Sequence, residues 1–308
     1  FVALIGQWRH SLVTGKLSTT LRIAERIFAL AQEQKGSAPL VKACMALAAT
    51  HYYLGSFQEA RRAALRGIEI LHAGGDLQAQ AEELDEPAIA CLCHEALCAW
   101  HFGEPSCHAP IDEAIALATK IGDTHGLAVA LYFGMILGHF ERDPAEVESK
   151  AADLVELSTR QGFVHFLPLA TILLGWARGI SGQTAQAISW IEDGMEKLRA
   201  SGGVLCWPYF LALKAEPLHL AGRTTEALEV ITQAEAIAEQ SGELWWSADL
   251  QRLRGVFLAA LGAEDARIAS SFRDAMRTAR DQKSISLERR AEQAYADYRA
   301  GKGETIAG

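Results

Sequence analysis

Two interleaved series of glycines, each repeating at a period of about 40 residues, constrain the fold more than any other feature of the chain. The first series closes runs of apolar sequence and the second lies between its members: Gly15, Gly55, Gly103, Gly182, Gly222 and Gly262, then Gly36, Gly74, Gly122, Gly162, Gly202 and Gly242. The first series lacks one member, and Glu141–Asp143 stands in its place. Because glycine commonly ends a helix where the backbone needs a positive φ, two series at one period predict a repeated helical hairpin.

The segments between these glycines are rich in Ala, Leu, Glu, Gln and Arg, with apolar residues three and four positions apart, which is typical of packed helices. We expect one domain over residues 1–300, with hairpins at about 2–35, 38–73, 87–121, 124–161, 163–201, 204–241 and 243–282. The more polar helix expected at 285–300 caps the stack where it meets water. The acidic, Gln-rich segment 73–86 is expected to be an exposed insertion, and 301–308 a flexible tail.

Small residues recur at matching places in the hairpins, which lets neighbouring helices approach closely. They are Ala48, Ala96, Gly175, Ala215 and Gly255 before the closing glycine, Ala60, Ala187 and Ala227 after it, and Gly67, Gly194 and Ala234 further along. This spacing is typical of tetratricopeptide (TPR) repeats, with longer helices. We therefore predict an all-α fold, a right-handed α-solenoid of about seven TPR-like hairpins, elongated, with the glycine turns along one edge.

Composition excludes several classes of function. The chain has 29 basic and 38 acidic residues, a formal net charge of −9, so a basic face for direct nucleic-acid binding is not expected. Its longest uncharged stretch, 126–140, is too short to span a bilayer. No phosphate-binding loop and no catalytic motif is present, so we expect neither an enzyme nor a cofactor. Six cysteines are few for 308 residues and favour a cytoplasmic, reducing setting.

The segment 91–108 concentrates cysteine and histidine. Cys91, His94, Cys98 and His101 lie on one helical stripe and are residue types that bind zinc. Ten residues of helix span about 15 Å, so the four cannot share one ion. Only a neighbouring pair can, with partners from elsewhere such as Cys107 and His108 after the turn. Since buried cysteines are common in tight helix packing, we expect no bound metal.

The first helix of each hairpin is expected to line the concave face of the superhelix. The candidate residues for binding a partner there are Tyr52, Trp100, Trp176, Tyr209, His219 and Arg252. Lys42, Met45, Cys93, Glu216 and Asp249 are expected on the same face. Aromatic and Arg contacts often dominate binding energy. The alternative is that Trp176 and Tyr209 simply pack between helices, as most aromatic residues in helical arrays do.

Four segments carry a resemblance to a known family: LGSFQEARRAALRGIEIL (54–71), LLGWARGISGQTAQAI (173–188), PYFLALKAEPLHLAG (208–222) and GELWWSADLQRLRGVFLAALG (242–262). They resemble the C-terminal TPR array of large bacterial signalling proteins, in which a nucleotide-cyclase or winged-helix effector domain and an AAA/STAND-type ATPase precede the array. This chain begins at Phe1 and not at methionine, so we expect a fragment of something longer. It departs from the family's pattern at 141–143, at Pro217 and in the Cys/His content of 91–108.

The resemblance implies a non-enzymatic recognition module that binds a protein segment or effector on its concave face and regulates an attached ATPase or effector domain. A small-molecule inducer is a second kind of partner compatible with this expectation. The alternative function is a small-molecule- or metal-responsive sensor built around the segment 91–108. The oligomeric state is left open.

Overall fold

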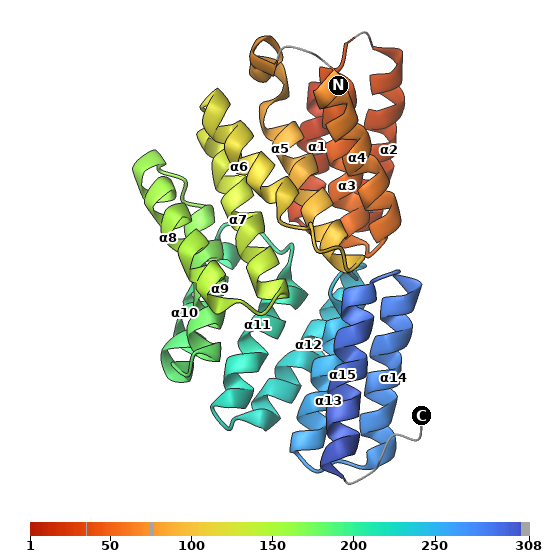
Figure 1. The fold of residues 1–308 in the computed structure, drawn as a ribbon, viewed down its shortest axis with the longest axis vertical. Helices are drawn as coiled ribbons and strands as arrows, with labels where there is room; N and C mark the ends of the chain where they lie inside the picture. Colours follow the sequence, from red (N-terminus) through yellow and green to blue (C-terminus); the bar gives the residue numbers. More distant parts are fainter. Residues whose placement is uncertain (35, 74–76, 303–308) are drawn as a thin grey trace.

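The computed structural model describes residues 1–34, 36–73 and 77–302, with the side chains of 77–85 left out, and the regular structure in these ranges is helical. In chain order the helices are α1 (Val2–Val13), α2 (Leu17–Glu33), α3 (Ala38–Tyr53), α4 (Phe57–Ala73), α5 (Leu77–His101), α6 (Ala109–Ile121), α7 (Thr124–Phe140), α8 (Pro144–Gln161), α9 (Phe166–Ile180), α10 (Thr184–Ala200), α11 (Trp207–Leu220), α12 (Thr224–Ser241), α13 (Ser247–Ala260), α14 (Asp265–Asp281) and α15 (Ile285–Gly301). They form seven stacked hairpins and a capping helix, α15 (Figure 1). The predicted all-α, TPR-like solenoid is confirmed. Among the helices described here, none combines the length and apolar character needed to cross a membrane.

The glycine turns are the second confirmed feature. Every described glycine of both series has a positive φ, from 68° at Gly262 to 109° at Gly36, while Gly74 lies outside the described residues. Where the first series lacks a glycine, Arg142 adopts a φ of 62° in its place. The period therefore reflects a backbone requirement, since side chains other than glycine are rarely stable in this region.

Odd-numbered and even-numbered helices have different environments. The odd-numbered helices are here called inner helices, and those between the two ends of the array are largely buried; in α7 every residue from Ala130 to Phe140 is buried, whereas the terminal helices α1 and α15 bury only a few residues. The even-numbered, outer helices bury one stripe, as α12 does with Ala227, Ile231, Ala234 and Ala238. The inner helices thus lie between the outer helices and the interior of the superhelix.

Small residues allow close helix packing, as the sequence predicted. A Cβ added at Gly175 would lie 2.7 Å from Ile191 Cγ1, and one added at Gly194 would lie 2.7 Å from Ile172 Cγ1. Equally short contacts would form at Gly67, with Cys91 Sγ at 2.6 Å. Such separations are far below van der Waals contact, so any side chain here would push the helices apart.

Helix α5 is longer at its N-terminus than expected. It begins at Leu77, ten residues before the predicted start of its hairpin, and contains Pro87. Most of the backbone of the expected insertion, 73–86, is therefore helical. Its exposure stays a prediction, because residues 74–76 and the side chains of 77–85 lie outside the description.

The superhelix closes on itself after about five hairpins. In Figure 1 the chain runs from the N-terminal helices at the upper right, through α6–α10 on the left, to α13–α15 directly below the first helices. The turn at Gly15 meets Val204, the turn at Gly55 meets Leu244, and the turn at Gly103 meets Ile285. We call this contact between the first turns and the later part of the chain the seam.

Hydrogen bonds cross the seam at four successive inner helices. Val13 O of α1 accepts from Val204 N at 3.0 Å, and Tyr53 O of α3 accepts from Leu244 N at 3.0 Å. Trp100 O of α5 accepts from Ser286 Oγ at 2.5 Å, and Phe140 O of α7 accepts from Arg290 Nη2. The last carbonyls of a helix have no partner within the helix, so each later segment satisfies a group that would otherwise need water.

The expected elongated superhelix, with the first helix of each hairpin lining a concave face, is therefore wrong in one respect: the superhelix is closed. The turns do follow one edge, but that edge packs against the opposite edge of the chain one superhelical turn later. Helix C-terminal carbonyls on one edge accept hydrogen bonds from the other edge, and apolar loop residues of the two edges pack together. The enclosed face becomes part of the hydrophobic core.

Candidate functional site

The predicted binding residues all lie on inner helices. Tyr52 is on α3, Trp100 on α5, Trp176 on α9, Tyr209 and His219 on α11, and Arg252 on α13. Four are enclosed: relative exposure is 1% for Tyr52, 8% for Trp100, and 0% for both Trp176 and Tyr209. Only His219 and Arg252 keep partial access to solvent.

Aromatic side chains fill the space that an open groove would occupy. Tyr209 lies 4.8 Å from Trp245, and Tyr52 lies 5.4 Å from the same ring, measured between centroids. Phe140 stacks on Trp246 at 4.8 Å. These contacts join inner helices of the second, fourth and sixth hairpins to the loop before α13. The alternative interpretation, in which Trp176 and Tyr209 pack between helices, describes their positions, and a role for them in binding stays a prediction that needs an open superhelix.

A buried charge network lies beside these aromatic rings. Glu216 of α11 accepts hydrogen bonds from Trp176 Nε1 at 3.0 Å and from Arg142 Nη1 at 2.8 Å. Asp249 of α13 accepts from Arg252 Nε at 2.7 Å, and Arg290 Nη1 of α15 lies 3.6 Å from the same carboxylate. Three arginines thus surround two carboxylates in this network, and Arg142 is the most exposed of the three.

The network sets the protonation of its members. Burial alone would raise the pKa of Glu216, but Arg142 and His139 outweigh burial and lower the pKa to about 2. Burial similarly opposes ionisation of Asp249, yet Arg252 and Arg290 hold the pKa of Asp249 well below its usual range. Burial lowers the pKa of His139 to about 4, so its ring is neutral near pH 7. Both carboxylates are therefore ionised near pH 7.

The zinc-type residues of α5 do not converge. His94 Nδ1 hydrogen bonds with Ala90 O at 2.7 Å, while His101 stacks on Phe57 and bonds with Ser284 Oγ at 2.8 Å. Cys91 packs against Gly67 on the outer helix α4. Of the residues that the structure describes, one group brings three possible metal ligands together, and it consists of Cys107, His108 and Glu141.

A cleft of about 950 Å³ lies on the outer side of the seam. The first turn of α4 forms one wall, and α12, α13 and the C-terminal end of α14 form the other. Gln282 donates from Nε2 to Leu244 O at 2.7 Å inside it, beside the turn at Gly55. The cleft therefore spans both edges of the seam, and its volume is in the range of small-ligand and peptide side-chain pockets.

Acidic side chains dominate the charge of this cleft. Its lining includes Glu59, Glu239 and Asp281, all exposed, and none of the three forms an ion pair with another described residue. Arg254 is neutralised by Glu235, whose Oε2 lies 2.9 Å from its Nη1, and by Asp274. Apart from this arginine, Lys283 is the one basic residue of the lining.

Sequence reasoning did not find this cleft. Glu59, Glu239 and Gln282 are ordinary polar residues of helix ends, and they meet because the superhelix closes. No local pattern in the sequence marks residues that come together over such separations.

Comparison with known proteins supports the fold. No family model matches the chain. It is 25% identical over 245 residues to an uncharacterized protein of Rhizobium meliloti (strain 1021). The matched region makes up 79% of this chain and 24% of that protein. The chain thus spans about a quarter of the length of this relative.

Two solved structures are similar to this chain to different degrees. A Rap protein complexed with Competence and Sporulation Factor matches with a TM-score of 0.67 and 12% identity, over 91% of this chain and 74% of that one. Bacillus thuringiensis PlcR in complex with the peptide PapR7 and DNA matches with a TM-score of 0.49 and 13% identity, over 99% of this chain and 98% of that one. The chain therefore has a TPR-like helical repeat fold similar to that of the Rap protein.

Proposed function

We propose that this chain is a non-enzymatic recognition module that binds a basic peptide segment in the cleft at the seam. The observation that carries the proposal is the position of the cleft: its two walls belong to hairpins about one superhelical turn apart. A segment that touches both walls contacts the closed form more extensively than an open one. Its binding would therefore favour closure.

Charge supports the choice of a basic segment. Glu59, Glu239 and Asp281 face the cleft without ion-pair partners among the described residues, against Lys283 alone. Opposite charge steers association and selects partners, and it does so most strongly where a concave surface concentrates the field. One similar structure is of a Rap protein complexed with Competence and Sporulation Factor, and this agrees with a role in ligand binding.

The module would act inside a larger bacterial signalling protein. The relative from Rhizobium meliloti is about four times as long as the matched region, which leaves room for an ATPase or effector domain of the kind that the resemblance implies. Closure of the seam by a ligand would change the relative positions of the first and last hairpins. An attached domain would respond to that change. The module would work in the cytoplasm, where its buried thiols stay reduced.

The proposal is tested by fluorescence anisotropy with a labelled Lys/Arg-rich peptide and the whole chain. Replacement of Glu239 by Lys is expected to weaken binding by about 10-fold, equivalent to ~1.4 kcal/mol. Glu229→Lys is the matched control, because Glu229 is exposed on the same helix, α12, but outside the cleft lining. Equal loss in both variants would mean attraction by net charge alone, and would contradict a site in the cleft.

A further inference from the structure

The connection between α5 and α6 differs from the other hairpin turns. Residues 102–108 separate these helices, seven residues, whereas three separate α3 from α4, α7 from α8 and α9 from α10. Helix α6 is correspondingly short, with 13 residues where the other outer helices have 17 or 18. The first turn of the outer helix is thus replaced by a loop, and its last residues are Cys107 and His108.

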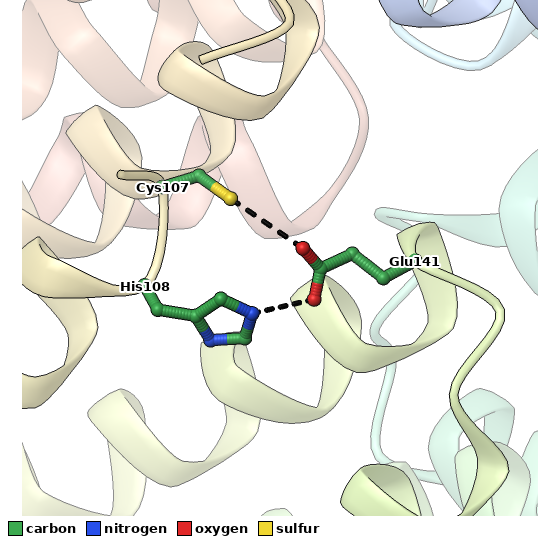
Figure 2. A group of neighbouring side chains, drawn as sticks. All are labelled: Cys107, His108 and Glu141. Carbon is green, nitrogen blue, oxygen red and sulfur yellow. Dashed lines mark hydrogen bonds and ion pairs between the residues drawn. The ribbon is translucent and has the colours of Figure 1, made fainter. Parts of the chain in front are cut away.

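Glu141 comes from the next hairpin and faces this loop. It is the C-cap residue of α7 and precedes Arg142, whose left-handed backbone reverses the chain. Figure 2 shows its carboxylate between the two loop side chains. Cys107 Sγ lies 3.6 Å from Glu141 Oε1, and His108 Nε2 lies 2.5 Å from Glu141 Oε2.

These separations are close to those of a zinc site. One ligand atom from each of Cys107, His108 and Glu141 lies within 4.8 Å of the other two. Zinc binds thiolate at about 2.3 Å and imidazole or carboxylate at about 2.0–2.2 Å, which places tetrahedral ligand atoms roughly 3.3–3.6 Å apart. Cys107 Sγ and Glu141 Oε1 are already at this separation, and His108 Nε2 approaches the other oxygen, Oε2, of the same carboxylate. The nitrogen–oxygen pair would have to open by about 0.8 Å, a small rotation for two partly exposed side chains.

We propose that Cys107, His108 and Glu141 bind one zinc ion, with the fourth position taken by water or by a donor atom of a ligand. One thiolate, one carboxylate and one neutral imidazole supply two negative charges, which balance the ion. Partial exposure of His108 (44%) and Glu141 (32%) leaves the metal a path from solvent. The expectation of no bound metal considered ligands within 91–108, including Cys107 and His108, but not Glu141, which comes from a different hairpin.

Zinc must displace the thiol proton, which passes to the solvent. An ordinary hydrogen-bonded pair of His108 and Glu141 would neither take up zinc nor release this proton.

The experiment is calorimetric titration of zinc chloride into the whole chain after treatment with a chelator. We expect one saturable zinc ion per chain, and a loss of affinity of about 10-fold or more in Cys107→Ser and in Glu141→Gln. The chain offers a matched control, His72→Ala. His72 Nε2 lies 2.8 Å from Glu113 Oε1, so this pair resembles His108–Glu141 but has no thiol beside it.

Cobalt provides a second measurement that does not depend on affinity. Bound Co²⁺ should show a thiolate charge-transfer band that Cys107→Ser removes. Absence of saturable zinc binding would overturn the proposal. Zinc binding that survives unchanged in Cys107→Ser, or that is lost in His72→Ala, would overturn the proposal too. A cobalt complex without the charge-transfer band would also overturn it.

Discussion

At the scale of single residues, the pKa of a buried carboxyl group depends on whether a charged partner lies beside it. Glu243 lies in the loop before α13 and is buried; it accepts from Trp245 Nε1 at 2.9 Å and from Cys206 N at 3.1 Å. Unlike Glu216 and Asp249, it has no arginine beside it among the residues that the structure describes. Burial therefore raises the pKa of Glu243 from 4.5 to about 8, although both hydrogen bonds favour the charged form.

Glu243→Gln is expected to change how stability depends on pH. Above pH 4.5 the unfolded chain releases this proton, whereas the folded chain keeps it until about pH 8. In this window the folded state binds more protons, so the free energy of unfolding contributed by Glu243 falls as pH rises, by about 1.4 kcal/mol per unit.

Denaturant unfolding of the two proteins at several pH values measures this effect. The free energy of unfolding of the wild type, minus that of Glu243→Gln, should decrease from pH 5 to pH 8. The lost acceptor costs the variant a hydrogen bond, but that cost is independent of pH. A constant difference across the window would mean that Glu243 ionises normally in the folded protein.

At the scale of elements, the helices and their turns were predictable and the contacts between distant turns were not. Gly55 and Gly222 occupy the same place in their hairpins and have nearly equal φ, 77° and 78°. Their local sequences predict a left-handed helix end in both. A Cβ at Gly222 would meet nothing within 4 Å, whereas one at Gly55 would collide with Gln282 Nε2 across the seam. The period reveals the shared backbone role, and only the closed superhelix reveals the second role of Gly55.

These two glycines allow the seam to be measured. Gly222→Ala is expected to cost roughly 1–2 kcal/mol of stability, because alanine is strained in the left-handed region. Gly55→Ala carries the same cost and also displaces Gln282 from Leu244 O, a hydrogen bond worth about 1 kcal/mol. Thermal or urea unfolding of both variants should therefore rank Gly55→Ala as less stable by about that amount. Equal stabilities would show that the contact between the Gly55 turn and Gln282 across the seam adds nothing to the stability of the fold.

At the scale of the whole molecule, closure decides which predicted site residues are accessible. Tyr52 and Tyr209 were correctly placed on inner helices from their register, because helical periodicity fixes which side of a hairpin a residue occupies. For Tyr209 the sequence left two outcomes open, an accessible face or packing between helices, and the choice depends on the pitch of the superhelix. Pitch results from small rotations summed over several hairpins, and no single repeat encodes it. The same limitation hid the cleft. The approach of Glu141 to Cys107 joins neighbouring hairpins and depends instead on the local shape of the loop 102–108.

Closure also changes how the molecule should unfold. In an open solenoid each repeat contacts only its neighbours, so damage to one end stays local. Here the first hairpin bonds to the loop before α11, and the second bonds to the loop before α13. The seam therefore couples the two ends of the chain. We expect the amides of both ends to lose their protection from hydrogen exchange together.

Hydrogen exchange of Ile27→Ala tests this coupling. Ile27 is fully buried on α2, and its truncation is expected to cost at least 2 kcal/mol, or about 30-fold in the exchange of amides that open globally. The faster exchange should extend to α11, α12 and α13, which lie far from Ile27 in sequence but adjoin the seam. Glu25→Ala, an exposed change on the same helix, should leave all these rates as they are. Faster exchange confined to α1–α4 would mean that the seam contacts are too weak to join the two edges, and the molecule would then behave as an open array.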